Sequence, residues 1–186
     1  MASRIYEDVN NLIHFHGTRD PQTILEERGV YVKPFREDTK LLGMFKVILG
    51  DKFVFYNKKL DDNNLRMMFA HELGHEYYHS DDDLNAEQIF SFRNAQEVEA
   101  NIFAAHLLIA NENILDYLSE GKSIGEMASL ECVDENLLII KLKELMRMKL
   151  IPEIDLSNNN EFFRNIDGKK AENWASEFSD DYYIDD

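Results

Sequence analysis

The feature that most constrains this chain is the sequence His-Glu-Leu-Gly-His at residues 71–75, which follows the pattern H-E-x-x-H. The pattern requires a helix, because residues four apart then lie one turn apart on the same face, where both imidazoles can reach one ion. The surrounding segment supplies that helix. Asp61 or Asp62 can cap its start, and apolar side chains recur at helical spacing to about His79. We therefore expect a metal-binding helix here, at the edge of the core.

Glu72 lies about 100° from His71 around the helix axis, so its carboxylate can contact a water at the metal without being a ligand. A bound zinc ion makes such a water acidic, and a neighbouring carboxylate can take the proton as the water attacks a carbonyl carbon. We therefore expect His71 and His75 to bind the metal and Glu72 to act as the general base of a hydrolase. Zinc, one ion per chain, is the preferred metal, although two histidines and a carboxylate suit several divalent metals.

A third protein ligand has to come from outside the motif, and the spacing excludes the most obvious candidate. His79 continues the four-residue repeat, but eight residues of helix rise about 12 Å, so His71 and His79 cannot both lie about 2.1 Å from one ion. A carboxylate on the next helix, expected from about Ala95 to Ala110, is the better candidate. Glu97 fits this role, and the alternative for Glu97 is an ordinary solvent-exposed helix charge.

The neighbours of Glu97 support this choice. Asn101 lies one turn further along the same helix face, where its side chain can hydrogen-bond the back of a ligand histidine. Glu99, by contrast, points away from that face by about 200°. Alanines on this helix would let it approach the first one closely. His79 and Tyr78 are expected to line the cleft or to support the ligands from outside, and a tyrosine there could stabilise an oxyanion.

Hydrophobic periodicity along the rest of the chain predicts an α+β fold. Two segments rich in β-branched and aromatic residues flank Gly50-Asp51, which predicts a β-hairpin before the metal-binding helix. Pro34 indicates that an earlier short strand lies at a sheet edge. The expected helices cover residues 4–16, 21–28, 61–79, 95–110, 111–120, 123–130 and 134–151, and the expected strands cover residues 30–35, 41–49 and 52–56.

The formal net charge of −16 limits the classes of partner. Such a surface repels phosphate backbones and anionic lipid, so we expect neither direct binding of nucleic acid nor membrane association. Ser123–Leu145 has the outline of a helix-turn-helix, but its second helix begins with Asp134 and Glu135, where a DNA reader presents lysine and arginine. A structural lobe, or a dock for the substrate, is the favoured interpretation.

Cys132 is the single cysteine, so an internal disulfide and a cysteine-rich zinc site are both excluded. This composition is typical of a reducing cytoplasm. Residues 1–10 lack the basic start and apolar run of a signal peptide, and no stretch of about 18 apolar residues occurs. We therefore expect a cytoplasmic protein, with Cys132 as a small core residue.

Taken together, these motifs resemble those of the ImmA/IrrE metallo-endopeptidases. The resemblance rests on His-Glu-Leu-Gly-His with a further histidine at position 79, followed by Glu-x-Glu-Ala-Asn-x-Phe-Ala-Ala at residues 97–105. The run Phe-Val-Phe-Tyr-Asn at residues 53–57 is similar to the segment before the active helix of that family. The resemblance covers roughly residues 30–145. It departs from the family pattern at residues 108–110, where Leu-Ile-Ala stands in place of the frequent Leu-Met-Pro.

The resemblance implies a gluzincin-like zinc peptidase in which His71, His75 and Glu97 bind the ion and Glu72 is the base. The implied fold is a mostly helical zincin-like domain with a small antiparallel β-sheet and a C-terminal helical lobe. We expect the peptidase domain over residues 1–121, the helical lobe over residues 122–153 and an acidic, mobile tail over residues 154–186.

Known members of this family cut a helix-turn-helix repressor, so the resemblance also implies a substrate. That substrate is a DNA-binding repressor of a mobile element or a stress regulon. A competing hypothesis is a non-catalytic, metal-containing protein that sequesters a basic repressor through its acidic surface.

Overall fold

A computed structural model describes residues 4–79, 89–154 and 156, with only the backbone described for His79 and residues 89–94. Met1–Pro152 forms one compact unit. The expected acidic tail lies outside the described residues apart from Ile154 and Leu156, and the expected division at residue 121 stays a prediction. In chain order the elements are α1 (Arg4–His16), α2 (Pro21–Glu27), β1 (Tyr31–Pro34), β2 (Gly43–Ile48), β3 (Asp51–Tyr56), α3 (Asp62–His79), α4 (Ile89–Leu108), α5 (Asn111–Ser119), α6 (Ile124–Glu131) and α7 (Glu135–Arg147).

The α+β fold class is confirmed, but the sheet is mixed, and the expectation of an antiparallel sheet was wrong for one strand pair. The strands lie in the order β1–β3–β2, with β2 antiparallel and β1 parallel to β3. β3 takes the middle position, where both of its backbone edges are paired, and its Val54 side chain is fully buried. β1 ends at Pro34, which has no N–H to donate, and it lies at an edge as expected.

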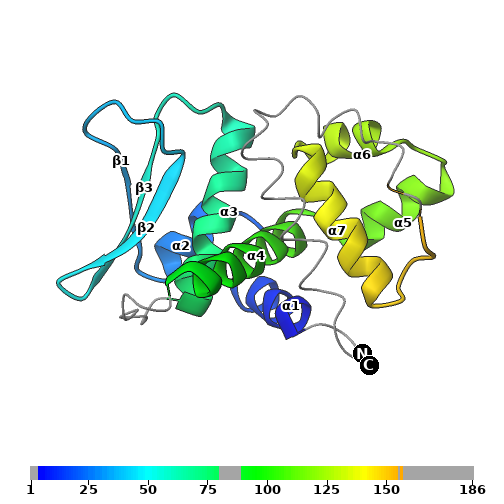
Figure 1. Cartoon of the computed structure of the whole chain (residues 1–186), viewed down its shortest axis with the longest axis horizontal. Helices are drawn as coiled ribbons and strands as arrows, with labels where there is room; N and C mark the ends of the chain where they lie inside the picture. The colour runs from blue at the N-terminus through cyan, green and yellow to red at the C-terminus, as the bar shows by residue number, and fades with distance from the viewer. Residues whose placement is uncertain (1–3, 80–88, 155, 157–186) are drawn as a thin grey trace. The chain divides into compact units, whose positions relative to one another are not determined.

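The sheet has two different faces. One face packs against α3, which lies alongside the strands in Figure 1. On this face Tyr56 contacts the ring of Phe69. The opposite face carries a row of aromatic rings, in which Phe53 stacks on both Tyr31 and Phe55 with centroids 5.2 and 5.7 Å apart. Aromatic neighbours of this kind stabilise a small sheet beyond the area that they bury.

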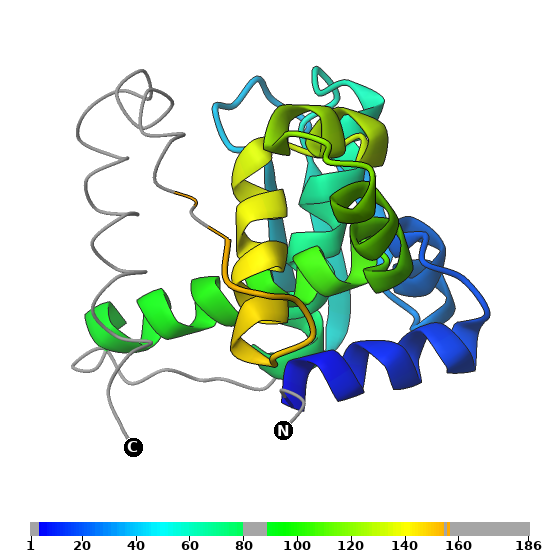
Figure 2. The same cartoon turned by 90° about the vertical axis from the view of Figure 1, so that its right-hand side faces the viewer.

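The helices α5, α6 and α7 lie on the other side of α3 and α4 from the sheet (Figures 1 and 2). Ser123 and Glu126 form the expected capping box at the start of α6. Cys132 corrects one expectation, because it is exposed and ends α6 in the left-handed conformation with φ 54°. Residues 132–134 then join α6 to α7, and the helix-turn-helix outline of this lobe stays a prediction. Most of α7 is buried, and it packs against α4.

Two helix boundaries differ from the expectation by more than two residues. α4 begins at Ile89 rather than near Ala95, and α7 ends at Arg147 rather than reaching Pro152. The early end of α7 coincides with Lys149, whose φ of 59° cannot continue a right-handed helix. No helix in the described ranges combines the length and the apolar character that crossing a membrane requires.

A buried polar cluster joins α4 to α7, on the side of α4 away from the metal motif. Lys141 is only 1% exposed, and its Nζ lies 3.0 Å from His106 Nδ1. Glu144 lies in the same cluster and accepts two hydrogen bonds from Arg147. Burial lowers the pKa of Lys141 to about 7.

This pKa predicts how stability depends on pH. The folded-state pKa of Lys141 lies below its ordinary value of 10.5, so between pH 7 and 10 the unfolded chain binds more protons than the folded chain. The free energy of unfolding should therefore rise between pH 7 and pH 9, by up to about 1.4 kcal/mol per pH unit from this group. Urea unfolding at three pH values should show this rise, and Lys141→Met should lose it. The control is Lys143→Met, two residues along the same helix. Parallel pH profiles for wild type and Lys141→Met would contradict the assignment.

Candidate metal centre

The structure brings together the three side chains that the sequence selected as ligands. His71 and His75 lie one turn apart on α3, with their Nε2 atoms 3.1 Å apart. α4 places Glu97 opposite them, with its carboxylate oxygens 3.3 Å from His71 Nε2 and 3.4 Å from His75 Nε2. All three donor atoms lie within 4.8 Å of one another. In the part of the chain that the structure describes, this is the one such cluster of His, Cys, Asp or Glu side chains.

The spacing of these donors fits one small divalent ion. Ligand atoms about 2.0–2.1 Å from a tetrahedral ion lie roughly 3.4 Å from one another. The separations of 3.1, 3.3 and 3.4 Å match that value. The chemistry of the set, two imidazole nitrogens and one carboxylate, is also that of a site which keeps its fourth position for water or substrate.

Asn101 fixes the protonation of His71 in a way that favours a cation. Asn101 Oδ1 lies 2.9 Å from His71 Nδ1 and accepts the proton on that nitrogen. On the neutral ring, Nε2 is then the nitrogen that can bind a cation, and it lies beside His75 Nε2 and Glu97. A positive charge, either a proton on an imidazole or a metal cation, stabilises three donors that lie so close together. The expected role of Asn101 at the back of a histidine therefore has the geometry that it requires.

The close approach of α3 and α4 makes this arrangement possible. Gly74, in the middle of the motif, faces Ala100, and a Cβ at position 74 would lie 2.9 Å from Ala100 Cα. That distance is shorter than two carbon atoms tolerate, and the neighbour is backbone that cannot swing aside. The glycine of the motif thus brings the two helices close enough for Glu97 to reach both histidines.

Glu72 lies beside the cluster and faces the sheet. Its side chain is buried, and its Oε2 accepts a hydrogen bond of 2.7 Å from the backbone N–H of Phe45 on β2. Burial raises the pKa of Glu72, against the opposing effect of His71 and His75. A raised pKa brings a carboxylate closer to the range in which a general base works best near neutral pH.

The charges of the cluster suit a cation that is open to solvent. Hydrogen bonds from His71 and His75 hold the pKa of Glu97 well below its usual value, so Glu97 is ionised. Burial alone would lower the pKa of His71, but the hydrogen bond to Glu97 and the charge of Glu72 outweigh it and raise this pKa. The side chain of Glu97 is 56% exposed, which leaves the cluster accessible from the α4 side.

The other expected residues lie differently. Tyr78 directs its hydroxyl to α1, where it donates a 2.8 Å hydrogen bond to Asp8, so the structure gives no support for a role of this hydroxyl in the cleft. Burial and Asp8 together raise the pKa of Tyr78. The side chain of His79 lies outside the described residues. The Phe45 amide could not be predicted from the sequence, because a backbone donor has no residue signature. Glu76 could have been found, because it lies four residues after Glu72 and so faces the same way.

The contact between α3 and α4 predicts the effect of one added methyl group. Gly74→Ala should force the two helices apart and weaken Zn²⁺ binding by about 10-fold to 100-fold, as disturbed metal sites typically lose. Competition with a chromophoric chelator measures this affinity. Gly125→Ala on α6 is the matched control, because its Cβ would meet only the flexible end of the Glu135 side chain at 3.0 Å. Equal Zn²⁺ affinity in wild type and Gly74→Ala would show that the contact does not set the site.

The chain is similar to known proteins over the region that contains the cluster. The profile of the IrrE N-terminal-like domain, a peptidase family, matches residues 25–150. The uncharacterized immunity region protein 2 of Bacillus phage phi105 is 25% identical over 143 residues, which is 76% of this chain and 89% of that protein. No solved structure matches the chain significantly. The matched region covers more than half of the chain and includes both helices of the cluster, so the chain belongs to the ImmA/IrrE peptidase family.

Proposed function

We propose that this chain is a zinc-dependent endopeptidase in which His71, His75 and Glu97 hold the ion. The observation that carries the proposal is the convergence of these three donors, 3.1–3.4 Å apart, beside a buried carboxylate. Membership of a peptidase family supports the same reaction class. A bound zinc ion supplies the Lewis acidity that polarises a peptide carbonyl and makes water a nucleophile at neutral pH.

Glu72 moves the proton in this proposal. Phe45 N–H holds Glu72 Oε2, which leaves Oε1 to take the proton of the attacking water. The same oxygen can then deliver the proton to the leaving amine nitrogen. Burial keeps Glu72 out of bulk water and in one orientation, which is what a general base needs in order to meet its substrate at hydrogen-bond distance.

In the sheet that the structure describes, β2 lies at an outer edge, which supports a polypeptide as the substrate. The backbone groups of an antiparallel strand point toward and away from the neighbouring strand at alternate residues. Just before β2, Leu42 C=O points toward the β3 side, because it accepts a hydrogen bond from Asn57 N–H. Phe45 lies three residues later, so its N–H and C=O point away from β3. The Phe45 N–H confirms this direction by its contact with Glu72. Glu72 occupies the Phe45 N–H, so an extended substrate segment would pair with the other outward-pointing backbone groups of β2 and pass beside the metal cluster. Pairing through the backbone does not require a chain end, which suits an endopeptidase.

A DNA-binding repressor is the substrate that the observations favour. Known members of the family cut such proteins, and the phage relative is named for an immunity region. DNA-binding proteins carry basic surfaces. A chain with a net charge of −16 attracts a basic partner over long range, which increases the rate of encounter.

The mechanism predicts that Glu72→Gln separates metal binding from catalysis. The amide keeps the shape of the side chain but cannot take a proton, so cleavage should fall by at least about 100-fold. Zinc content should stay at the wild-type level, because Glu72 is not a ligand. Asp62→Asn, at the exposed start of the same helix, is the matched loss of one charge and should cleave normally. Wild-type cleavage by Glu72→Gln would refute the proposed base.

Family members often cut a repressor that is encoded beside them, so the first candidate substrate is a helix-turn-helix repressor encoded next to this protein. The zinc-loaded protein is incubated with that repressor, and both chains are followed by mass spectrometry. Two fragments with a single cut site are the expected result. An intact repressor in a stable complex would instead support the sequestering protein, in which the metal is structural.

A further inference from the structure

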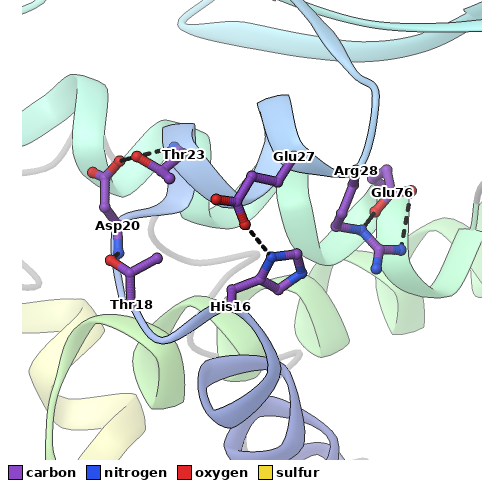
Figure 3. Close-up of polar contacts among 7 residues, drawn as sticks. All are labelled: His16, Thr18, Asp20, Thr23, Glu27, Arg28 and Glu76. Atoms are coloured by element: carbon purple, nitrogen blue, oxygen red, sulfur yellow. Dashed lines mark hydrogen bonds and ion pairs between the residues drawn. The ribbon is translucent and has the colours of Figure 1, made fainter.

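A buried ion cluster lies on α3 one turn beyond Glu72, and it takes no part in the proposed chemistry. Glu76 is only 1% exposed, yet two cations reach it from different elements. Arg28, just after α2, places its Nε 2.6 Å from Oε2 and its Nη2 3.2 Å from Oε1, a contact that Figure 3 shows. Lys52 of β3 places its Nζ 2.8 Å from Oε1. We call Arg28, Lys52 and Glu76 the α3 clamp.

The clamp and the contact between Phe45 and Glu72 lie on the same side of α3. Glu72 and Glu76 are four residues apart, so both face the sheet and are separated by about 6 Å along the helix. On the hairpin, Lys52 lies opposite Val47. Val47 is two residues from Phe45, so Lys52 and Phe45 are separated by about 7 Å along the strands. The two spacings nearly match, so both contacts form together in one register of the hairpin against α3.

A slip of the hairpin by one residue would break both contacts. It would move the strand by about 3.4 Å and turn each side chain to the opposite face of the sheet. Lys52 would then point to the aromatic face, away from Glu76. The amide of Phe45 would also leave Glu72, because neighbouring N–H groups of a strand point in opposite directions.

We propose that Lys52 and Arg28, acting through Glu76, are positioning residues that hold α3 and the β2–β3 hairpin in the register at which Phe45 N–H meets Glu72. This inference rests on the proposed function for its catalytic consequence, although the register itself does not. Arg28 adds a second constraint, because its guanidinium also lies 5.2 Å from the centre of the Tyr77 ring. The end of α2 is thereby tied to two successive residues of α3.

Registry is the role for which a buried ion cluster is best suited. A buried ion pair gains little net stability over a well-packed apolar replacement, because desolvation of the charges offsets their attraction. Its directional contacts, however, select one arrangement among several that bury similar area. Removing one of two cations leaves Glu76 paired with the other, so the fold survives while the constraint from the sheet is lost.

The test compares Lys52→Met with Lys52→Arg and with Lys33→Met, an exposed lysine on β1 of the same sheet. The first readout is hydrogen exchange of the Phe45 amide by NMR, measured relative to the Val54 amide of β3 in the same protein. We expect exchange at Phe45 to become about 10-fold faster in Lys52→Met, since the loss of one positioning contact typically changes a site by about that factor. Lys52→Arg and Lys33→Met should stay within about two-fold of wild type on the same scale.

The second readout is turnover of the neighbouring repressor by the same zinc-loaded proteins. In Lys52→Met, kcat should fall about 10-fold while KM and zinc content stay near wild type, as expected when a base is misplaced but its ligands are not. Unchanged exchange at Phe45 in Lys52→Met would overturn the proposal, as would equal acceleration at Phe45 and Val54. If Phe45 responds as expected but wild type cleaves nothing, the positioning role stands and the proposed function fails.

Discussion

The contact between Gly74 and Ala100 is the constraint on which the metal cluster depends. Two helices with ordinary side chains at their crossing stand 8–10 Å apart, and a carboxylate on one reaches two histidines on the other only if they come closer. Here the absence of a Cβ at position 74 allows the backbone of α4 to approach that of α3. The histidines on either side of this glycine then point toward Glu97. The motif therefore encodes the helix contact as well as the ligands.

Helix α3 organises the unit because it meets α4 on one side and the sheet and the end of α2 on another. His71 and His75 face α4, Glu72 faces the free edge of β2, and Glu76 faces β3 and the end of α2. Leu73 is fully buried in the core. Polar groups at such positions are unfavourable unless each has a partner. Here the carboxylates of Glu72, Glu76 and Glu97 each have one. The functional groups are thereby held by the same contacts that assemble the fold.

How much of this could be predicted from the sequence depends on how local each relation is. His71 and His75 share one face of α3 because they are four residues apart, and Glu97 and Asn101 share one face of α4 for the same reason. The structure places all four side chains on the faces that were expected. The direction of Glu72 followed from the same pitch, but its partner did not. The Phe45 amide lies on a strand, and its contact depends on the register of the hairpin against α3.

Relations between distant segments were predicted less well. The strand near Pro34 was expected at an edge, and it lies there. Its parallel pairing with β3 was not predicted, because this pairing depends on which strand of the hairpin lies in the middle of the sheet. Both strands of the hairpin are apolar enough for the middle position. Cys132 was expected in the core because of its residue type. It instead ends α6 in a left-handed conformation, which is set by the need to turn the chain into α7. Glu76 was not singled out from the sequence, because its partners Arg28 and Lys52 come from distant segments of the chain.

The central claim, a metal held between α3 and α4, is tested most directly by the metal content of the purified protein. Elemental mass spectrometry after supply of zinc should find about one zinc per chain in wild type and a clear loss in Glu97→Ala. Glu99→Ala, which removes an acidic side chain two residues along α4, should keep the wild-type content. Wild type without metal after zinc is supplied, or with equal metal in Glu97→Ala, would contradict the account.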